Sequence, residues 1–303
     1  MVTRAQVESA QERVLGRVRR TPVMRTPSAW LKLEFTQHTG SFKARGAFNR
    51  VLAAFESGEF DGDTGVVAAS GGNAGLAVAH AARELEVPAT VYVPETAPAV
   101  KVARLHELGA SVVQVGHEYA EAYEAATKYA ADHGSLFVHA YDQPDVVAGQ
   151  GTIALELEDQ VPDVDTILVS VGGGGLMAGI AAATDAAVVA VEPMDCPTLN
   201  KALSAGAPVD VHVSGVAADS LGARRIGDIA FELATRKGVH SLLVPDNAIV
   251  EARRRLWREH RFVVEHGAAC ALAALTSGAY LPEEDERVAV ILCGANTDPS
   301  DLG

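Results

Sequence analysis

The sequence has little cysteine and little positive charge. Its three cysteines (Cys196, Cys270 and Cys293) are far apart and form no Cys-x-x-Cys pair, which excludes a disulfide-built fold and indicates a reducing compartment. Asp and Glu outnumber Lys and Arg by 39 to 25, and the net charge is −14. A nucleic-acid surface is therefore not expected, because phosphate contacts need clustered cations. The arginines between Arg253 and Arg261 lie among helix-forming residues, and we interpret them as a solvated helix face.

Long apolar runs are also absent from the sequence. No run reaches the roughly 18 residues that suggest a membrane span. The segment around Arg4 and Gln6 lacks the apolar stretch of a signal peptide, so we expect a soluble cytoplasmic protein. What the chain does have is 303 residues, 48% of them hydrophobic and 21% charged, which is enough to bury a large core without disulfides.

Short apolar runs alternate with alanine-rich stretches of helical composition, and this alternation is typical of an α/β fold. The runs are continuously apolar, so they predict strands of parallel sheets that are covered on both faces. We expect strands at Val66–Ala69, Thr90–Val93, Val112–Val115, Leu136–His139, Thr166–Val171, Val188–Glu192 and Val288–Cys293. We expect helices at Gly75–Leu85, Ala99–Leu108, Tyr119–Asp132 and Ala248–His260, the last of them N-capped by Asp246.

No tandem repeat, low-complexity tract or long linker divides the chain, so its domains are expected to be interleaved. The segment 64–140 contains several strand–helix units and could form a sheet of its own. We predict that residues 64–140 form a small inserted α/β domain. Residues 1–63 and 141–303 would together form a large domain around a parallel sheet.

Two predicted strands end in glycine-rich loops that lead into helices, and such strand ends are the natural ligand sites of parallel sheets. Ser70–Asn73 follows the first strand, and Gly172–Leu176, with four consecutive glycines, follows the fifth. Glycine lets the backbone approach a ligand, and the next helix offers free N–H groups, so either loop could bind a phosphate. The alternative is a tight turn without a ligand. The entropic cost of four glycines favours phosphate binding for the second loop.

The second loop also fits a different ligand. Gly173, Gly175 and Ala178 satisfy the loose dinucleotide fingerprint, and Glu192 ends the next strand where a ribose-binding carboxylate belongs. On this loop alone, an NAD-binding oxidoreductase or nucleotide-binding module stays open. The fingerprint leaves the rest of the chain unexplained.

Two further residues could carry chemistry. Lys43, one of only six lysines, lies between Phe42 and a stretch of small residues, where desolvation would lower its pKa and make it a nucleophile or base. Cys293 ends an apolar strand just before a glycine. Taken singly, an ordinary surface lysine and a buried structural thiol are the better interpretations. The sequence contains no Gly-x-Ser-x-Gly elbow, no Gly-Lys-Ser/Thr phosphate loop and no His-Glu-x-x-His motif.

Taken together and in order, these pieces resemble one family, the pyridoxal-phosphate enzymes of the tryptophan-synthase-β type (fold type II). Within it they are most similar to threonine and serine dehydratases and serine racemase. The resemblance covers nearly the whole chain and implies a two-domain α/β fold, a parallel-sheet large domain with an inserted smaller domain, pyridoxal 5′-phosphate as cofactor, and a homodimer. It rests on Arg20–Pro22, Lys32–Glu34, Ser41–Lys43, Val93–Pro98, Ala148–Ile153, Gly172–Gly175, Glu192–Pro193 and Cys293–Asn296.

The resemblance also implies roles for individual residues. Lys43 would hold the cofactor as a Schiff base and then act as the base at the substrate Cα. Cys293 would face the pyridine nitrogen as a neutral, weak donor, which suits β-elimination and disfavours transamination. The other implied cofactor contacts are Phe42, Asn73, Gly172, Gly173, Gly174, Gly175 and Leu176, and the implied substrate contacts are Ser70, Gly71, Gly72 and Glu265.

The activity implied by the resemblance is an ammonia-lyase that converts L-threonine or L-serine to 2-oxobutyrate or pyruvate plus ammonia. A serine racemase, or another fold type II enzyme acting on a 3-hydroxy amino acid, is the alternative. Racemisation needs a second acid–base group opposite the lysine, and the racemases have a serine where this chain has Gly71. Glycine cannot transfer a proton, so we favour the dehydratase.

The expectation for a metal is the least defined. Racemase-like enzymes bind a divalent cation near a Glu-Pro pair, and here Glu192–Pro193 keeps the glutamate, but the spacing of a second carboxylate does not match. We predict no metal ligand set. Glu192 stays open as one ligand of a monovalent or divalent cation held partly by backbone carbonyls.

Overall fold

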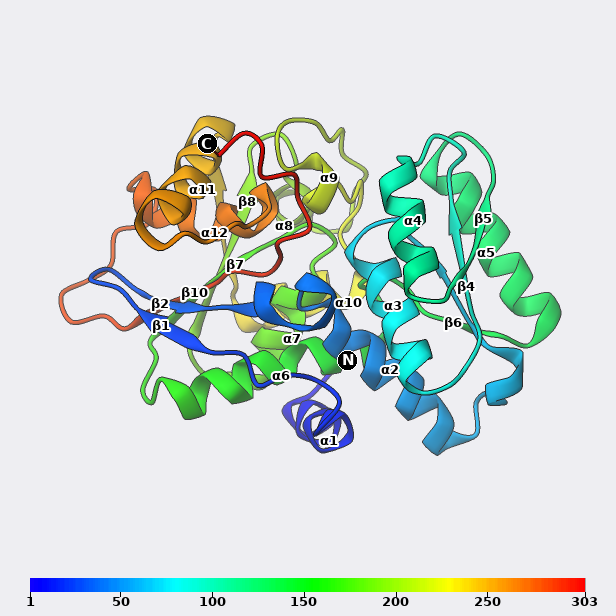
Figure 1. The fold of residues 1–303 in the computed structure, drawn as a ribbon. Coiled ribbons are helices and arrows are strands. Elements are labelled where there is room, and N and C mark those ends of the chain that lie inside the picture. Colours follow the sequence, from blue (N-terminus) through cyan, green and yellow to red (C-terminus); the bar gives the residue numbers. More distant parts are fainter. Residues whose placement is uncertain (303) are drawn as a thin grey trace.

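The computed structural model describes residues 1–302 and contains two β-sheets with helices packed on them (Figure 1). The larger sheet has six strands in the order β1-β2-β10-β7-β8-β9, and the smaller has four in the order β5-β4-β3-β6. Neighbouring strands are parallel except for the β1–β2 hairpin. The strands are β1 (Val23–Arg25), β2 (Trp30–Lys32), β3 (Val66–Ala69), β4 (Ala89–Val93), β5 (Ser111–Gln114), β6 (Leu136–Phe137), β7 (Thr166–Ser170), β8 (Ala187–Pro193), β9 (His240–Val244) and β10 (Val288–Ile291).

Helices cover both faces of each sheet. Helix α12 packs on one face of the larger sheet and α7 on the other, with α6 behind α7, whereas α3 and α5 cover the smaller sheet (Figure 1). The α-helices are α1 (Arg4–Val14), α2 (Lys43–Ser57), α3 (Asn73–Glu84), α4 (Ala99–Glu107), α5 (Tyr119–His133), α6 (Pro144–Gln160), α7 (Gly175–Ala183), α8 (Thr198–Ala205), α9 (Ala218–Leu221), α10 (Asp228–Lys237), α11 (Asp246–His260) and α12 (His266–Thr276). Short 3-10 helices are η1 (Glu34–Thr36), η2 (His38–Gly40) and η3 (Gly62–Thr64).

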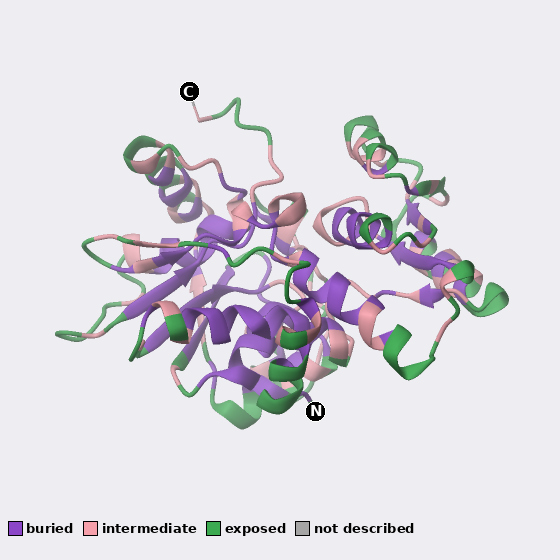
Figure 2. Cartoon of the chain, turned by 60° about the horizontal axis from the view of Figure 1, so that its bottom comes forward, coloured by how far each residue is buried: buried purple, intermediate pink, exposed green. Residues whose placement is uncertain are grey.

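The central strands are buried on both sides, which explains their continuous apolar runs. In β3, Val66 and Ala68 pack into the core on the α3 side, and Val67 and Ala69 pack into the core on the α5 side. Strand β7 is buried along its whole length in the core of the larger sheet (Figure 2). Because successive side chains of a strand point to opposite faces, a strand covered on both faces needs apolar residues at every position.

The seven predicted strands correspond to β3 to β8 and β10, and their observed ends lie within two residues of the predicted ones. The prediction missed β1, β2 and β9. Strands β1 and β2 are only three residues long, and β9 is an edge strand with half-exposed side chains. One predicted cap was wrong. Asp246 is the first residue of α11 and Pro245 holds the cap position, while the Asp246 carboxylate accepts a hydrogen bond from the N–H of Val216 at 2.9 Å.

The interpretation of the arginine-rich helix as wholly solvated is also wrong at one position. Arg253 on α11 is buried, and its guanidinium donates to the carbonyl of Val264 at 2.7 Å and to the carbonyl of Asp298 at 3.0 Å. Arg254 and Arg255 are exposed, as expected. Arg253 therefore ties α11 to the C-terminal segment.

Helix α2 lies outside the predicted small domain but shares its core. Ala47, Phe48 and Val51 on α2 belong to the same apolar cluster as Leu76 of α3 and Val91 of β4. The helix also packs on α6 beside the larger sheet, so it bridges the two halves (Figure 1). The division of the chain at residues 64 and 140 stays a prediction.

A buried cluster of four charges fixes the first turn of α2. Arg45 is fully buried and pairs with Glu34 of η1 and Glu156 of α6, each at 2.7 Å. Lys32 of β2 pairs with Glu156 at 2.6 Å. Breaking a buried pair strands an uncompensated charge, so this ion cluster holds β2, α2 and α6 in register.

No helix among residues 1–302 combines the length and the apolar composition that crossing a membrane requires.

Candidate active site

The candidate site forms where the chain leaving β10 meets the chain entering α2. The N–H of Phe42 donates to the carbonyl of Cys293 at 3.1 Å, and Ser41 and Gly294 form an antiparallel bridge. These backbone contacts bring Lys43, at the start of α2, next to the thiol of Cys293. Two residues 250 positions apart thus share one site, as the sequence prediction requires.

Lys43 has the environment of a reactive amine. Its Nζ donates to the carbonyl of Ala140 at 2.5 Å and lies 5.0 Å from the centre of the Phe42 ring. Burial lowers its pKa to about 8, although nearby Cys293 and Glu265 partly oppose the shift. A lysine with this pKa supplies an appreciable fraction of free amine near neutral pH, which a nucleophile or base needs.

Two buried acidic groups face this amine. Burial raises the pKa of the Cys293 thiol well above its ordinary value, so the thiol is neutral. Burial also raises the pKa of Glu265, at the start of α12, to about 7, and a hydrogen bond from Asn73 limits that shift. A group facing Cys293 therefore meets a neutral, weak donor and not a carboxylate.

Asn73, the first residue of α3, is held from two sides. Its Nδ2 donates to Glu265 Oε1 at 2.8 Å, and its Oδ1 accepts from Asn296 Nδ2 at 2.6 Å. Only glycine fits beside this contact at position 294, because a Cβ built there would lie 2.0 Å from Glu265 Oε1. The site thereby joins α3 of the smaller sheet to α12 and to the segment that follows β10.

The glycine loop after β7 is a tight cradle. A Cβ on Gly173 would lie 2.4 Å from the ring of Tyr141, and Gly174 has a φ of 86°, which disfavours other residues. The carbonyl of Gly172 accepts from Thr198 Oγ1 at 2.7 Å. Within residues 1–302, the N–H groups of Gly173 to Leu176 have no acceptor. Free N–H groups at a helix N-terminus are able to bind an anion.

A buried amide without hydrogen-bond partners lies beside the same glycine loop. Gln150 of α6 is fully buried, and neither its oxygen nor its nitrogen has a hydrogen-bond partner within residues 1–302. Its Oε1 lies 2.9 Å from the position of a Cβ on Gly175. A buried amide without partners is costly. Together, the free amine of Lys43, the N–H cradle and this amide fit a ligand that has an aldehyde and a phosphate, as pyridoxal phosphate does.

The first glycine loop is roomier. The Oγ of Ser70 accepts from the N–H of Gly72 at 3.2 Å, which turns the loop into α3. A Cβ built on Gly71 would meet Val93 Cγ1 at 3.4 Å and Lys101 Cβ at 4.0 Å, which are ordinary contacts. Gly71 and Gly72 are half-buried, and α4 places Lys101 beside Gly71, with the Lys101 ammonium paired to Asp219.

Sequence reasoning missed three groups of this site. Tyr141 packs on Gly173, the Ala140 carbonyl accepts from Lys43, and Gln150 reaches Gly175. The Ala-Gly-Gln-Gly-Thr motif carried the only signal, and it marked Gln150 as part of the resemblance without a role. Nothing in the sequence distinguishes Tyr141 from other aromatic residues.

Glu192 caps a helix. Its carboxylate accepts from the N–H groups of Leu199 and Asn200 at 2.7 and 2.8 Å, and burial raises its pKa to about 7. The donors at the start of α8 thus occupy both oxygens of the one candidate cation ligand. Within residues 1–302, no group of three or more His, Cys, Asp or Glu side chains is placed to hold a metal ion.

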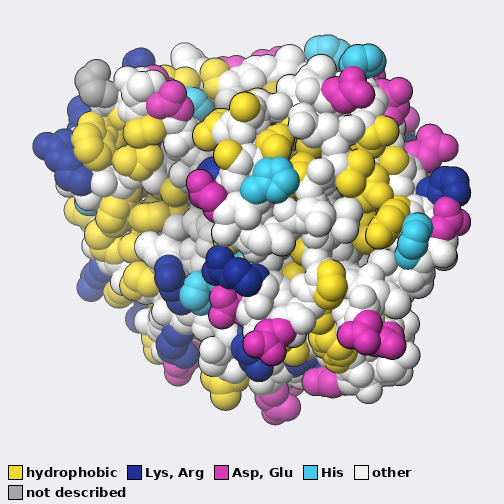
Figure 3. Space-filling view, turned by 45° about the vertical axis from the view of Figure 1, so that its right-hand side comes forward, with side chains coloured by type: hydrophobic (Ala, Val, Ile, Leu, Met, Phe, Trp, Pro, Cys, Tyr) yellow, Lys and Arg dark blue, Asp and Glu magenta, His cyan; other side chains and the backbone are white. Residues whose placement is uncertain are grey.

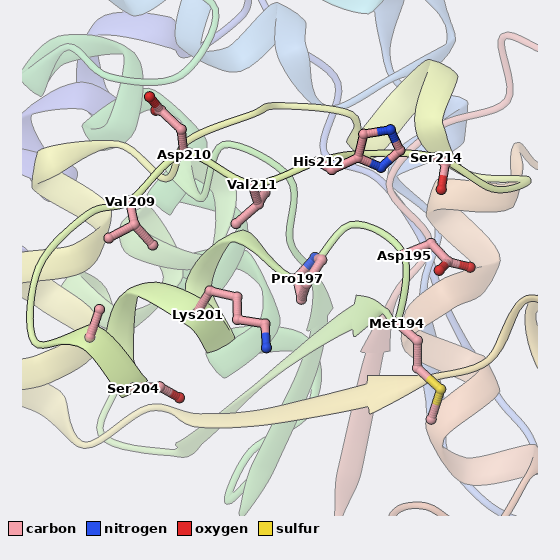
Figure 4. A pocket seen from close by; sticks show the side chains of 11 residues that line it. Met194, Asp195, Pro197, Lys201, Ser204, Val209, Asp210, Val211, His212 and Ser214 are labelled. Carbon is pink, nitrogen blue, oxygen red and sulfur yellow. The ribbon is translucent and has the colours of Figure 1, made fainter.

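A separate cavity of about 640 Å³ lies between α8 and the segment 209–214. Lys201 of α8, Pro197, Val209 and Val211 are among the residues that line it (Figure 4). None of the candidate site residues lines this cavity. On the face shown in Figure 3, acidic and basic side chains are interspersed.

Comparison with known proteins agrees with this geometry. The model of the family "Pyridoxal-phosphate dependent enzyme" matches residues 14–294. The chain is 34% identical to the L-threonine ammonia-lyase of Thermotoga maritima, covering 98% of this chain and 76% of that protein. It is 37% identical to an L-threo-3-hydroxyaspartate ammonia-lyase of a Pseudomonas species, covering 96% of this chain and 94% of that protein. The fold matches the structure of maize serine racemase with a TM-score of 0.93 and 29% identity, covering 99% and 95% of the two chains.

These matches favour the fold type II resemblance over the dinucleotide fingerprint, since they span nearly the whole chain and not one loop. The fold is accordingly the α/β fold of type II enzymes. The chain belongs to the family of pyridoxal-phosphate dependent enzymes, and its cofactor is pyridoxal 5′-phosphate.

Proposed function

We propose that this enzyme is an ammonia-lyase that converts L-threonine or L-serine to 2-oxobutyrate or pyruvate plus ammonia. The observation that carries the proposal is the buried Lys43 amine, with a pKa near 8, beside the neutral thiol of Cys293. The L-threonine ammonia-lyase of Thermotoga maritima supports the same reaction class.

The residues that would hold the cofactor come from both halves of the molecule. Lys43 would bind it covalently, Phe42 would pack beside its ring, and Asn73 would donate to its phenolic oxygen. Residues Gly172 to Leu176 would hold its phosphate through their free N–H groups. When bound, pyridoxal phosphate withdraws electrons from the substrate Cα and so makes the Cα proton acidic.

The protein residues would then bind the substrate and move the proton. Ser70, Gly71 and Gly72 would hold the substrate carboxylate, and Glu265 would lie close by. Lys43, freed as an amine, would take the proton from Cα while the β-hydroxyl leaves as water. Water then replaces the amino group, so that one 3-hydroxy amino acid gives one 2-oxo acid and one ammonia. A neutral thiol at Cys293 leaves the ring nitrogen largely unprotonated, which favours this elimination over transamination.

The deciding experiment combines a spectrum with a product assay. The purified enzyme should absorb at roughly 410–430 nm, as the lysine-bound cofactor does. With L-threonine or L-serine it should release 2-oxo acid and ammonia in equal amounts. Lys43→Ala should lose both the absorbance and the activity, whereas the exposed Lys201→Ala should keep both. A yellow enzyme that makes neither product would refute the lyase proposal and leave the cofactor assignment intact.

Serine racemase is the second candidate, and the likeness to the maize enzyme favours it. Gly71 argues against it, because glycine offers no proton on the face opposite Lys43. A serine side chain fits at this position, since a Cβ there makes only ordinary contacts. We expect Gly71→Ser to form D-serine from L-serine at a rate well above that of the parent. Substantial racemisation by the parent enzyme itself would overturn the assignment as a lyase.

The substrate side chain is a further question, and a substrate with a second carboxylate deserves a direct test. Lys101 lies beside Gly71 of the first glycine loop, and an L-threo-3-hydroxyaspartate ammonia-lyase is 37% identical to this chain. Comparing kcat/KM for L-threonine, L-serine and L-threo-3-hydroxyaspartate decides between them. If the acidic substrate is preferred, Lys101→Met should lower kcat/KM for that substrate more than for L-threonine.

We also propose that the enzyme is a homodimer in the cytoplasm. A symmetric dimer is the commonest assembly of soluble enzymes. Light scattering should give twice the chain mass of 31.6 kDa, and a mass equal to one chain would contradict the dimer. The buried, unpaired thiols of Cys196, Cys270 and Cys293 fit a reducing compartment. Fractionation of the source cells would test the location.

A further inference from the structure

The amide of Asn296, three residues after Cys293, can point in only one direction. Its Oδ1 accepts from Arg104 Nη2 at 2.6 Å, and its Nδ2 donates to the carbonyl of Thr39 at 2.7 Å. An arginine can only donate and a carbonyl can only accept. The two partners therefore fix the oxygen of this amide toward Arg104 and its nitrogen toward Thr39.

The fixed amide determines the orientation of Asn73. The second N–H of Asn296 donates to Asn73 Oδ1 at 2.6 Å, so the oxygen of Asn73 must face Asn296. The nitrogen of Asn73 then faces Glu265 Oε1, to which it donates at 2.8 Å. One N–H is used in that bond, and Asn73 keeps a second N–H for another acceptor.

We propose that Asn296 and Arg104 are positioning residues, which turn the Asn73 amide so that it presents N–H and not oxygen to the phenolic oxygen of the cofactor. The proposal rests on the proposed contact between Asn73 and the cofactor. An anionic oxygen gains from a donor and is repelled by an amide oxygen. Since an amide turned by 180° has the same shape, packing alone does not select the correct orientation. Donor-only Arg104 and acceptor-only Thr39 make that selection at Asn296, and the Glu265 carboxyl, which accepts from the Asn73 nitrogen, favours the same orientation.

The hydrogen-bonded chain Arg104–Asn296–Asn73 joins residues beside the two sheets. Arg104 lies on α4 and Asn73 on α3, both beside the smaller sheet. Asn296 follows β10 of the larger sheet, and Glu265 caps the N-terminus of α12, which packs on that sheet. Thr39 belongs to η2, just before Lys43. The direction of one amide in the site is therefore set by a cation on another helix, two hydrogen bonds away.

The test is Asn296→Asp, which keeps the shape and removes both donors. Arg104 keeps the new carboxylate ionised, so Asn73 has to turn its nitrogen toward residue 296 and its oxygen toward Glu265 and the cofactor. Pyridoxal phosphate should bind about tenfold more weakly, as the loss of a hydrogen bond to a charged group predicts. The visible absorbance should shift to shorter wavelength. Affinity is measured by titrating the apoenzyme with pyridoxal phosphate, and thermal unfolding of the apoenzyme is recorded beside it.

Matched variants separate orientation from structure. Asn247→Asp makes the same chemical change at an exposed position of α11 and should leave cofactor affinity and spectrum unchanged. Arg104→Lys keeps a donor and should behave as the parent, whereas Arg104→Met should weaken pyridoxal phosphate binding several-fold at unchanged thermal stability. These two variants decide the question even where Asn296→Asp fails to fold.

Two results would overturn the proposal. One is an Asn296→Asp apoenzyme that folds and binds pyridoxal phosphate with parental affinity and spectrum. The other is equal binding by Arg104→Lys and Arg104→Met. Both readouts concern the cofactor, so a parent enzyme without lyase activity would refute the proposed reaction and leave this inference standing.

Discussion

Lys43 and Arg45 stand two residues apart at the start of α2 but belong to two different clusters of polar side chains. Arg45 belongs to the ion cluster of Lys32, Glu34, Arg45 and Glu156, in which each charge has an opposite charge within 2.7 Å. Lys43 belongs to the site cluster of Lys43, Asn73, Glu265 and Cys293, in which the amine contacts a carbonyl and the carboxylate contacts an amide. The ion cluster is buried throughout, whereas Lys43 and Asn73 of the site cluster are half-buried, and the two clusters also differ in pairing.

The pKa values follow from this difference. In the ion cluster, burial works against the charges of Arg45 and Glu156, but the pairing outweighs it, so the pKa of Arg45 is raised and that of Glu156 is lowered. Burial lowers the pKa of Lys32, which the carboxylates offset only in part. In the site cluster burial prevails, and it brings the pKa of Lys43 to about 8 and that of Glu265 to about 7. Pairing outweighs burial for Arg45 and Glu156 but not for Lys32, and the incomplete pairing of the site cluster leaves groups that exchange protons near neutral pH.

The largest effect on stability is expected for Arg45→Met. Methionine fills much of the space but leaves the Glu34 carboxylate buried without a cation, which costs about 3–5 kcal/mol. Urea unfolding of the apoenzyme measures the loss, and Arg254→Met at an exposed position of α11 is the control. A loss no greater than that of the control would mean that pairing in the ion cluster is not what stabilises this region.

The next effect concerns Glu265→Gln and depends on pH. Burial raises the pKa of Glu265 from 4.5 to about 7, so between these values the folded protein holds a proton that the unfolded chain has released. The stabilisation from this group is complete below 4.5 and is lost as pH rises through 7. Glutamine does not titrate. Relative to the parent apoenzyme, Glu265→Gln should therefore gain up to about 3 kcal/mol between pH 4.5 and pH 8.

Urea unfolding at both pH values gives this difference. Glu124→Gln, exposed on α5, is the control and should show no such gain. If the Glu265→Gln difference is the same at pH 4.5 and pH 8, the carboxyl titrates normally and the contrast between the clusters is wrong at this residue.

The smallest effect is expected for Arg255→Ala. Arg255 and Glu259 form a half-exposed pair on α11 at 2.9 Å, one helical turn apart. Such pairs contribute less than about 0.5 kcal/mol, because water screens them and the side chains lose freedom. Chemical unfolding at low and high salt should show little change in either case. A loss of the size expected for Arg45→Met would show that pairing, and not buried pairing, governs stability in this protein.

Much of the fold could be predicted from local pattern. Strands such as β3 and β7 are apolar at every position because both of their faces are covered, and this leaves a direct trace in the sequence. The edge strand β9 and strand β1 leave no such trace, since half-exposed strands tolerate polar residues, and the buried strand β2 is only three residues long and ends in the charged Lys32. Burial of Arg253 was not predictable either, because its partners Val264 and Asp298 are set by how the C-terminal segment returns to α11.

The residues of the candidate site also divide into those that local sequence predicts and those that only the tertiary structure places. Its glycine loops and Lys43 stand out in the sequence because special backbone geometry and a rare residue are local properties. The sequence by itself thus determined the fold class, the cofactor through the family resemblance, and the segments that build the site. Only the tertiary structure decided that Gln150 reaches Gly175, that Glu192 caps α8, and that Arg104 and Asn296 orient Asn73. The physical reason is that hydrogen-bond direction and desolvation depend on neighbours far away in the chain, which no local pattern encodes.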